Sequence, residues 1–359
     1  MRVTIKDIAK KTGLSVSTVS LVLNHKSDRI SEKTIRAVLE TAQEMHYHPN
    51  RIAVGLITKK TQTLGLIIPD IANAFFAEIA KGAETECQKQ RYSLILCNTN
   101  DNPQKDVDYV NVLIDKGVDG ILFTMAVSSQ VRKDLQCFHI VRQEEKPMIL
   151  VDRAVQDEGA EPAAPCVSVD NELGGYLATK HLLQFGHKKI GFISGPMGEQ
   201  SSRNRLFGYI KALQECSVTF DPTLIKVGDY HMETGYRLSG ELIAQGVTAI
   251  FAGNDMMAYG VYKQAKERHI PIPGGLSVVG FDDLEFSQFM EVPLTSMKQP
   301  AYKIGECAVQ KIIGWIEHPE EKPESVRFQP ELMTRESSGG VPRARTLPKE
   351  RTVENGENS

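Results

Sequence analysis

The sequence lacks the short motifs that mark several enzyme classes. Its 359 residues contain neither GxGxxG nor GxxxxGK[ST], so nucleotide binding has no support. Residues 191–195 (GFISG) have the spacing GxxSG instead of the GxSxG of a nucleophile elbow, and we interpret them as a strand end followed by a turn. We therefore predict no catalytic residues and no cofactor, and we do not expect an enzyme.

Long apolar runs and paired cysteines are also missing. No apolar run approaches the roughly 18 residues that span a membrane, and the N-terminus has charges but no apolar stretch typical of a signal peptide. The six cysteines (87, 97, 137, 166, 216 and 307) include no CxxC pair and no nearby histidine at zinc-ligand spacing. His46 and His48 would point opposite ways on a helix, so we predict no metal site. These absences favour a soluble, cytoplasmic protein with reduced thiols and no membrane contact.

Charge is unevenly distributed along the chain. Residues 1–60 contain eleven Lys and Arg against five Asp and Glu, a net charge of +6. The remainder contains 31 against 40, a net charge of −9, and the whole chain has a net charge of −3. A basic N-terminal segment on an acidic body predicts that affinity for phosphate is confined to one end of the molecule.

Residues 4–24, TIKDIAKKTGLSVSTVSLVLN, predict two short helices joined by a turn. Thr4 is a favourable N-cap, and Asp7 three residues later can complete a capping box. Gly13 can take the left-handed conformation that ends the first helix, and Ser15 can cap the second. This arrangement is typical of a helix-turn-helix, and an ordinary helical hairpin is the alternative. In a helix-turn-helix the outward face of the second helix enters the DNA major groove, and here that face contains Val16, Ser17, Ser20 and Leu21.

A third helix is predicted from Glu32 to about His46, with Ser31 as its N-cap. Pro49 disfavours helix at the residue before it. Residues 51–57 (RIAVGLI) could form one more helix, but a helix of about seven residues should not be stable without a partner.

The segments TIKDIAKKTGLSVSTVSLVLN and ISEKTIRAVLETAQEMHYHPNRIAVGL resemble the DNA-binding head and hinge of the lactose/galactose-repressor (LacI/GalR) family. In that family the hinge helix folds only on operator DNA, where a leucine from each subunit wedges open the central base step in the minor groove. The resemblance gives Leu56 this wedge role and puts Asn50, Arg51 and Ala53 around it. The alternative for Leu56 is a linker residue packed on the body of the protein.

Within the head, the resemblance puts Val16, Ser17 and Leu21 in the base-reading positions. Leu21 departs from the arginine often found there, and apolar or small readers make few bidentate bonds to guanine, so the operator sequence stays open. For Ser15 and Ser31, which are also candidates for DNA contacts, a role as helix N-cap explains the residue type equally well. Further candidates for contacts with phosphate or the DNA backbone are Thr4, Ser15, Thr18, Ser20, Asn24 and Ser31.

From residue 64 onward, short apolar runs alternate with amphipathic helices such as residues 76–90 and 107–116. Alternating strands and helices predict an α/β fold with doubly wound parallel sheets. The fold class is therefore an all-α head followed by α/β subdomains. The predicted strands are residues 64–68, 93–97, 120–123, 148–151, 167–169, 189–193, 249–252 and 276–280.

Polar and aromatic residues follow most of these strands, and ligands of such sheets bind beyond the carboxyl ends of the strands. Two phenyl rings, several charges and amides would make a poor core, because unpaired buried charges cost several kcal/mol. They suit a ring with apolar faces and a rim of hydroxyls, which describes a sugar.

The family resemblance extends over this part of the chain through HLLQFGHKKIGFISGP, AIFAGNDMMAYGVYKQA and LSVVGFDDLEFSQFMEVPLTSMKQP. It implies two subdomains similar to ribose-type periplasmic sugar-binding proteins, and it favours a pentose or a similar monosaccharide as effector. The effector-binding residues that the resemblance implies are Phe75, Phe76, Asp152, Arg153, Arg205, Asn254, Asp282 and Gln299.

We predict four parts of the chain: a DNA-binding head (1–49), a hinge (50–61), an effector-binding and dimerisation domain (62–338) and a disordered tail (339–359). The chain should cross between the subdomains near residues 160, 290 and 325, so that the N-subdomain contains about 62–160 and 291–324 and the C-subdomain about 161–290 and 325–338. The tail has one leucine (Leu347) where tetrameric family members have a leucine heptad, which favours a homodimer.

The expected function is a transcriptional repressor that binds double-stranded operator DNA and is controlled allosterically by a sugar. The alternatives are a sugar-binding protein without a DNA role, a regulator responding to a non-sugar or corepressor ligand, and a cytoplasmic sugar enzyme. Neither the basic head nor the missing export signal fits a transport protein.

Overall fold

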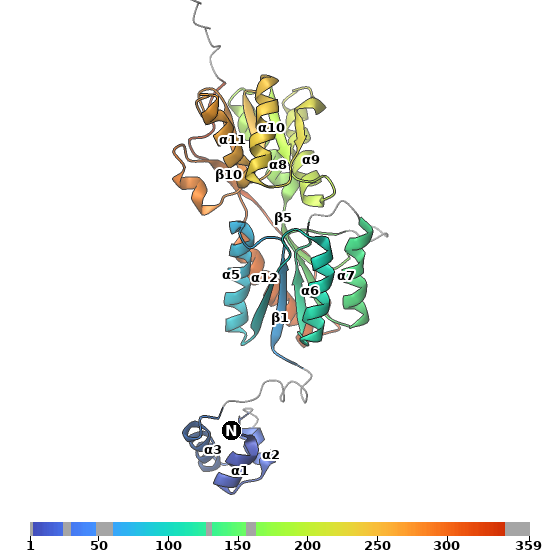
Figure 1. The fold of residues 1–359 in the computed structure, drawn as a ribbon, viewed down its shortest axis with the longest axis vertical. Coiled ribbons are helices and arrows are strands. Elements are labelled where there is room, and N and C mark those ends of the chain that lie inside the picture. Colours follow the sequence, from blue (N-terminus) through green and yellow to red (C-terminus); the bar gives the residue numbers. More distant parts are fainter. Residues whose placement is uncertain (1–2, 24–29, 48–59, 127–130, 156–162, 342–359) are drawn as a thin grey trace, which may run out of the picture. The chain divides into compact units, whose positions relative to one another are not determined.

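The computed structural model describes residues 3–23, 30–47, 60–126, 131–155 and 163–341 (Figure 1). The chain divides into two compact units, Met1–Thr61 and Gln62–Ser359, and each is described here by itself. Within the described ranges, no helix is both long enough and apolar enough to cross a membrane.

The first unit is a small bundle of three helices, α1 (Ile5–Thr12), α2 (Val16–Leu23) and α3 (Glu32–Glu44). The N–H and hydroxyl of Thr4 donate to Asp7 Oδ2 at 2.8 and 2.7 Å, which fixes the start of α1. Gly13 follows α1 with a φ of 69°, the left-handed conformation that glycine tolerates. The three helices predicted within residues 4–46 are therefore confirmed, and the possible helix at 51–57 lies outside the described residues. The buried core of this unit consists of Ile8, Ala9, Val19, Val22, Val38 and Ala42.

The second unit contains two six-stranded sheets. The first has the order β11-β5-β4-β3-β1-β2, and every neighbouring pair in it is parallel. Its strands are β1 (Thr63–Ile68), β2 (Ser93–Asn98), β3 (Gly120–Phe123), β4 (Met148–Val151), β5 (Cys166–Val169) and β11 (Val326–Phe328), and its helices are α5 (Ala74–Lys89), α6 (Pro103–Asp115), α7 (Val131–Gln143) and α12 (Ala301–Glu317).

The second sheet repeats this order as β12-β10-β9-β8-β6-β7, and only the edge strand β12 is antiparallel to its neighbour. Its strands are β6 (Ile190–Ser194), β7 (Ile225–Val227), β8 (Ala249–Ala252), β9 (Ser277–Asp282), β10 (Thr295–Lys298) and β12 (Glu331–Met333). Its helices are α8 (Asn171–Gln184), α9 (Gln200–Glu215), α10 (Met232–Ala244) and α11 (Asp255–Glu267), with short 3-10 helices at Pro222–Leu224 and Glu285–Phe289.

Helices cover both faces of each sheet because neighbouring residues of a buried strand point to opposite faces. In β1, Leu66 packs in the cluster with α5 and α12, whereas Ile67 packs in the cluster with α6 and α7. In β6, Phe192 faces α8 and α9, and Ile193 faces α10 and α11. The predicted doubly wound α/β architecture is therefore confirmed.

The chain crosses between the subdomains later than the sequence predicted. β5 was expected in the C-subdomain but pairs with β4 in the first sheet, and β11 pairs with β5 there. β10 was expected in the N-subdomain but pairs with β9 in the second sheet. The chain therefore crosses after β5, β10 and β11, whereas the predicted crossings lay just before these strands.

The predicted tail also begins too early. The Gly339 N–H donates to Ser277 Oγ at 3.1 Å, and the Val341 N–H donates to the Phe185 carbonyl at 3.3 Å. Residues 339–341 therefore belong to the second subdomain, and the rest of the predicted tail (342–359) lies outside the described residues.

Candidate effector site and DNA-binding surface

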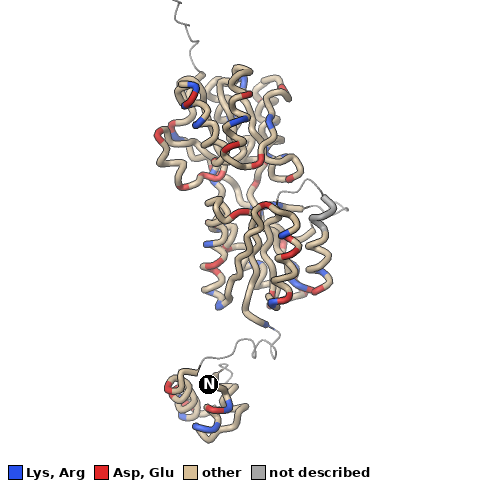
Figure 2. The backbone as a smooth tube through the Cα atoms, viewed as in Figure 1, with Lys and Arg blue, Asp and Glu red and all other residues tan. Residues whose placement is uncertain are grey.

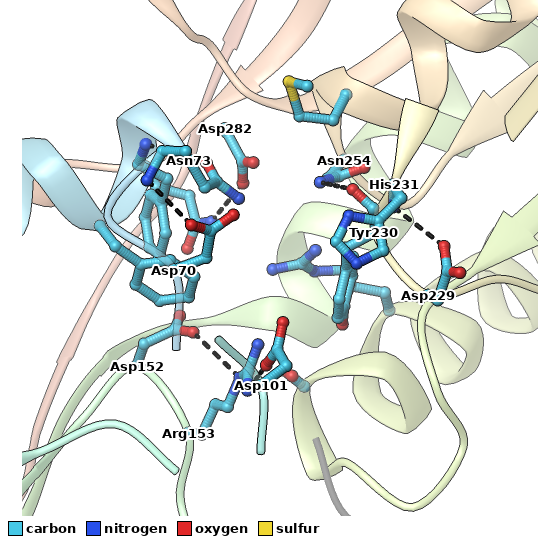
Figure 3. A pocket seen from close by; sticks show the side chains of 17 residues that line it. Asp70, Asn73, Asp101, Asp152, Arg153, Asp229, Tyr230, His231, Asn254 and Asp282 are labelled. Atoms are coloured by element: carbon cyan, nitrogen blue, oxygen red, sulfur yellow. Dashed lines mark hydrogen bonds and ion pairs between the residues drawn. The ribbon is translucent and has the colours of Figure 1, made fainter. Parts of the chain in front are cut away.

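A cavity of about 130 Å³ lies where the two α/β subdomains face each other (Figure 3). Its walls come from the ends of β1, β2 and β4 on one side and from α9, β7, α11 and β9 on the other. All eight residues predicted for the effector site line this cavity: Phe75, Phe76, Asp152, Arg153, Arg205, Asn254, Asp282 and Gln299.

The aromatic wall comes from the first turn of α5. Asn73 caps this helix, and its Oδ1 accepts a hydrogen bond from the Phe75 N–H at 3.1 Å. The rings of Phe75 and Phe76 are both buried and meet edge to face, with centroids 5.1 Å apart. A fixed pair of rings offers a stacking surface to the apolar face of a ligand.

Asp152 and Arg153 follow β4 directly, and both are buried. Arg153 Nη1 donates to the Met125 carbonyl at 2.5 Å, and its guanidinium carbon lies 5.6 Å from the centre of the Phe76 ring. Its Nε lies 3.3 Å from Glu199 Oε1, which comes from the other subdomain. This ion pair therefore joins the two sides of the cavity.

Arg205 reaches the cavity from α9, which approaches α8 very closely. A Cβ on Gly175 would lie 2.2 Å from the Arg205 carbonyl oxygen, so this approach requires glycine. Arg205 Nε donates to Asn171 Oδ1 at 2.8 Å, and Nη1 donates to the Gly253 carbonyl at 2.5 Å. The guanidinium carbon lies 3.7 Å from the centre of the Phe281 ring. These contacts hold the cation in one orientation.

The remaining predicted residues bring amides and a carboxylate to the site. Asn254 caps α11, with its Oδ1 accepting from the Met257 N–H at 2.9 Å and its Nδ2 donating to the Tyr230 carbonyl at 3.1 Å. Gln299 Nε2 donates to Asp282 Oδ1 at 2.7 Å. This orientation of the Gln299 amide suits an ionised Asp282, whose carboxylate oxygen accepts from Nε2.

Burial changes the acid–base properties of the two aspartates. It raises the pKa of Asp152 to about 6, although Arg153 and Arg205 oppose this effect. Burial also raises the pKa of Asp282 well above its ordinary value, again against the effect of Arg205. Carboxyl groups with raised pKa in a cleft are typical of ligand sites.

Two buried acceptors in the cavity lack a hydrogen-bond partner among the described residues. They are Asp152 Oδ1 and Gln299 Oε1. An unsatisfied buried acceptor costs about 1–3 kcal/mol, so a ligand that donates hydrogen bonds to both atoms would recover this energy.

Other cavity residues were missing from the predicted set. Tyr230 follows β7, a short and partly exposed strand that is absent from the predicted strands. Asp101 follows β2, and its Oδ1 lies 3.6 Å from Arg153 Nη1. The polar run Gly-Asp-Tyr-His at 228–231 was the sequence signal that could have identified Tyr230. The further lining residues outside the predicted set are Asp70, Ala72, Asn73, Ser201, Asp229, His231 and Met256.

The head presents the predicted base-reading residues on an exposed face of α2. Val16 and Leu21 are 43% and 44% exposed, and Ser17 is also exposed. Ser15 Oγ accepts from the Thr18 N–H at 3.1 Å, so this serine caps α2, and Ser31 caps α3 in the same way. Thr4 is engaged in the cap of α1, and Thr18 and Ser20 are partly buried. The other DNA-contact candidates, Asn24, Asn50, Arg51, Ala53 and Leu56, lie outside the described residues.

Comparison with known families covers both units of the chain. Residues 4–50 match the bacterial regulatory proteins of the lacI family, and residues 61–336 match the periplasmic binding proteins and sugar-binding domain of the LacI family. The chain belongs to the LacI family. The resemblance stated from sequence is therefore confirmed.

Individual LacI-family proteins are similar over most of the chain. The HTH-type transcriptional repressor PurR of Haemophilus influenzae (strain PittEE) is 35% identical over 342 residues, which cover 93% of this chain and 98% of that protein. A complex of the transcriptional regulator CelR with cellobiose is 27% identical with a TM-score of 0.71, covering 94% of this chain and all of that one. A LacI-family regulator from Enterococcus faecium with bound ribose is 28% identical with a TM-score of 0.67, covering 78% of this chain and 99% of that one.

This LacI-family chain is thus a DNA-binding transcriptional repressor with a ligand-binding domain, and its relatives are not enzymes.

Proposed function

We propose that this protein is a sequence-specific repressor whose affinity for its operator is controlled by a small sugar bound between the two α/β subdomains. A pentose such as ribose is the favoured effector. The protein acts in the cytoplasm as a homodimer, so its operator is roughly palindromic.

One observation carries the sugar proposal: paired phenyl rings and unsatisfied buried acceptors line the same small cavity. The rings suit the apolar face of a sugar ring, and Asp152 and Gln299 suit its hydroxyl donors. The ribose bound to the Enterococcus faecium relative supports the same ligand class. The other potential donors to a sugar, Arg153, Arg205 and Asn254, lie in the same lining.

The DNA-binding part of the proposal rests on α2 and the hinge. The exposed side chains of Val16, Ser17 and Leu21 would contact base edges in the major groove. We assign residues 1–49 to the head and 50–61 to the hinge, with Leu56 as the minor-groove wedge and Asn50, Arg51 and Ala53 around it. Unstacking a base step costs a few kcal/mol, which the additional contacts with bent DNA repay.

Sugar binding would control the hinge by closing the two subdomains on the ligand. Closure shifts the N-subdomains of the dimer relative to each other, so the two hinge segments no longer meet correctly on DNA. Such coupling is typically about 1–3 kcal/mol and is reciprocal, so operator DNA weakens sugar binding by the factor by which sugar weakens DNA binding.

A combined binding experiment tests this function. The purified chain is screened by thermal shift against common mono- and disaccharides, and each hit is added to a gel shift with operator DNA selected from random duplexes. We expect a pentose to raise the melting temperature, since a ligand at a hundredfold excess over its Kd stabilises by about 2.7 kcal/mol, and to lower operator affinity. If the protein prefers no duplex sequence at physiological salt, the proposed role as a sequence-specific repressor is wrong. If a sugar binds but no duplex gives a gel shift, the protein is a sugar-binding protein without a DNA role.

A purine base is the second candidate effector, because the repressors that are about 35% identical over nearly the whole chain are named PurR. A flat heterocycle could stack on Phe75 or Phe76 and donate ring N–H groups to Asp152 and Gln299. Including hypoxanthine and guanine in the thermal-shift screen separates the two ligand classes. Such a ligand could act as corepressor, in which case the gel shift would show tighter DNA binding.

A further inference from the structure

The effector cavity contains many more acidic groups than basic ones. Five aspartates, all labelled in Figure 3, and two arginines line it, and Glu199 Oε1 lies 3.3 Å from Arg153 Nε. In the backbone view, positions of Asp and Glu recur between the two α/β subdomains (Figure 2). Even without Asp152 and Asp282, whose pKa burial raises, three aspartates and Glu199 outnumber the two arginines, so the charge of the site does not favour a negatively charged ligand.

Arg153 is already compensated by groups of the protein. Its Nη1 donates to the Met125 carbonyl at 2.5 Å and lies 3.6 Å from Asp101 Oδ1. Its Nε lies 3.3 Å from Glu199 Oε1 and 3.9 Å from Asp152 Oδ2. Three carboxylates thus surround one buried guanidinium group.

Arg205 is engaged in a similar way. Its Nε and Nη1 donate to Asn171 and to the Gly253 carbonyl, and its flat face lies on the Phe281 ring. Bidentate binding of a phosphate requires two neighbouring N–H groups directed at the anion. A guanidinium group has two such edges, Nε with Nη2 and Nη1 with Nη2. In both arginines Nε and Nη1 are directed at atoms of the protein, so one donor of each edge is already engaged.

The unsatisfied atoms in the cavity are acceptors. Asp152 Oδ1 and Gln299 Oε1 are both on nearly fully buried side chains and require hydrogen-bond donors from the ligand. A hydroxyl group meets this requirement, whereas the oxygens of a phosphate dianion would add acceptors to a site that already has too many.

Glu199 is held in place from the second subdomain. It lies at the N-cap of α9, and its Oε2 accepts a hydrogen bond from the Tyr230 hydroxyl at 3.0 Å. Its side chain is only 9% exposed. Its other oxygen, Oε1, has no hydrogen-bond partner among the described residues and lies 3.3 Å from Arg153 Nε, so Glu199 acts on Arg153 through its charge.

We propose that the effector site selects an uncharged, hydroxylated ligand and rejects the phosphorylated form of the same ligand, and that Glu199 is the residue that sets this selectivity. The inference rests on the proposed sugar-controlled function and specifies its ligand class. Glu199 acts through Arg153: its charge satisfies the guanidinium group, which would otherwise attract an anion. Replacing Glu199 by glutamine keeps the side-chain shape and an acceptor for Tyr230 but removes the negative charge.

The test measures the binding of D-ribose and D-ribose 5-phosphate to the full chain by isothermal titration calorimetry. For the wild type we expect the phosphate to bind at least about 100-fold more weakly than ribose. In Glu199→Gln we expect this ratio to fall at least tenfold, mainly because the phosphate binds more tightly. Glu215→Gln is the matched control, since Glu215 is an exposed glutamate at the other end of the same helix and pairs with Lys180; it should leave the ratio unchanged.

Several outcomes would overturn the inference. Equal binding of ribose and its phosphate by the wild type would refute the charge selectivity. An unchanged ratio in Glu199→Gln, with melting curves that show the variant folded, would refute the role of Glu199.

Failure of the sugar proposal gives a different result. If neither sugar binds, the same comparison is made with hypoxanthine and inosine 5′-monophosphate. If hypoxanthine binds and its monophosphate does not, the proposed sugar effector is wrong, but the selectivity for an uncharged ligand is supported. Tighter binding of the monophosphate, or binding of neither member of either pair, would refute the inference.

Discussion

The two units of this chain present their candidate binding residues in opposite ways. In the head, Val16 and Leu21 are exposed on α2, and the core is formed by other residues of the same helix, Val19 and Val22. In the body, Arg153 and Arg205 are almost completely buried and bonded to several segments of the fold. We infer that binding and stability can be separated by mutation in the head, whereas in the effector site they are coupled.

The largest effect should come from Arg205→Ala in the body. The substitution removes a buried cation and leaves the carboxylates of Asp282 and Asp152 without its compensation, a type of change that costs about 3–5 kcal/mol. We expect effector binding to be lost by more than about 100-fold, since one charge-assisted contact to a buried ligand is worth about 1.5–3 kcal/mol and the site also loses its geometry. Calorimetry and urea denaturation measure the two effects.

Arg203→Ala is the control for this prediction. Arg203 is on the same helix and donates only to the loop carbonyls of Met197 and Gly198. It should change neither effector binding nor stability by more than about 1 kcal/mol. If Arg205→Ala lost effector binding but kept full stability, the inference that effector binding and stability are coupled in the body would be wrong.

In the head, Leu21→Ala and Val22→Ala should separate binding from stability. Leu21→Ala should weaken operator binding by about five- to thirtyfold, or 1–2 kcal/mol, because the side chain is placed to contact bases. Its effect on stability should stay within about 0.5 kcal/mol, as is usual for surface positions. Val22→Ala should instead destabilise the head by about 2 kcal/mol, because the side chain is buried.

Gel shifts and thermal denaturation of the same two samples provide the measurements. A Leu21→Ala protein with unchanged operator affinity would remove this residue from the base-reading set. A Leu21→Ala protein that unfolds as easily as Val22→Ala would contradict the separation in the head.

Local patterns predicted the parts of the fold that are continuous in sequence. β3 and β4 are four-residue apolar runs in which every residue is buried, so both runs were recognisable as strands. Asp152 and Arg153 directly follow such a run, and the family resemblance assigned both to the site. Phe75 and Phe76 were identified through the family resemblance.

Features that depend on which strands become neighbours were not predictable in this way. β7 has three residues, none fully buried, and gives no alternating pattern, so Tyr230 was missed. Glu199 precedes a helix and has no local signal, and its importance comes from the contact with Arg153 on the other subdomain. The crossing points were misplaced for the same reason, since only the completed sheets show that β5 belongs to the first and β10 to the second.

A smaller effect should come from pH in the body. Burial raises the pKa of Asp152 to about 6, so the carboxyl takes up a proton as pH falls through this value. Because the folded state binds this proton more tightly than the unfolded state, protonation stabilises the free protein below about pH 6, but it removes an acceptor from the ligand. We therefore expect effector affinity to fall up to about tenfold between pH 7.5 and 5, measured by calorimetry.

Asp152→Asn tests the assignment of this pH dependence. The variant should bind the effector weakly and with a flatter pH profile, because the titrating group is gone. A wild-type profile that is flat across pH 6, or a variant that retains the full slope, would exclude Asp152 as the titrating group.

The smallest effect should come from Ser31→Ala in the head. Ser31 Oγ accepts from the Thr34 N–H at 3.3 Å and caps α3, and loss of an N-cap costs about 1 kcal/mol. If capping is its whole role, operator affinity measured well below the melting temperature should stay within about twofold of the wild type, and the salt dependence of binding should be unchanged. A phosphate contact predicts weaker binding to every duplex sequence, so thermal denaturation and gel shifts with two unrelated duplexes separate the two roles that the sequence left open. If Ser31→Ala binds every duplex more weakly but is as stable as the wild type, Ser31 is a DNA contact. DNA binding and stability would then be separable at a helix cap of the head as well as on the exposed face of α2.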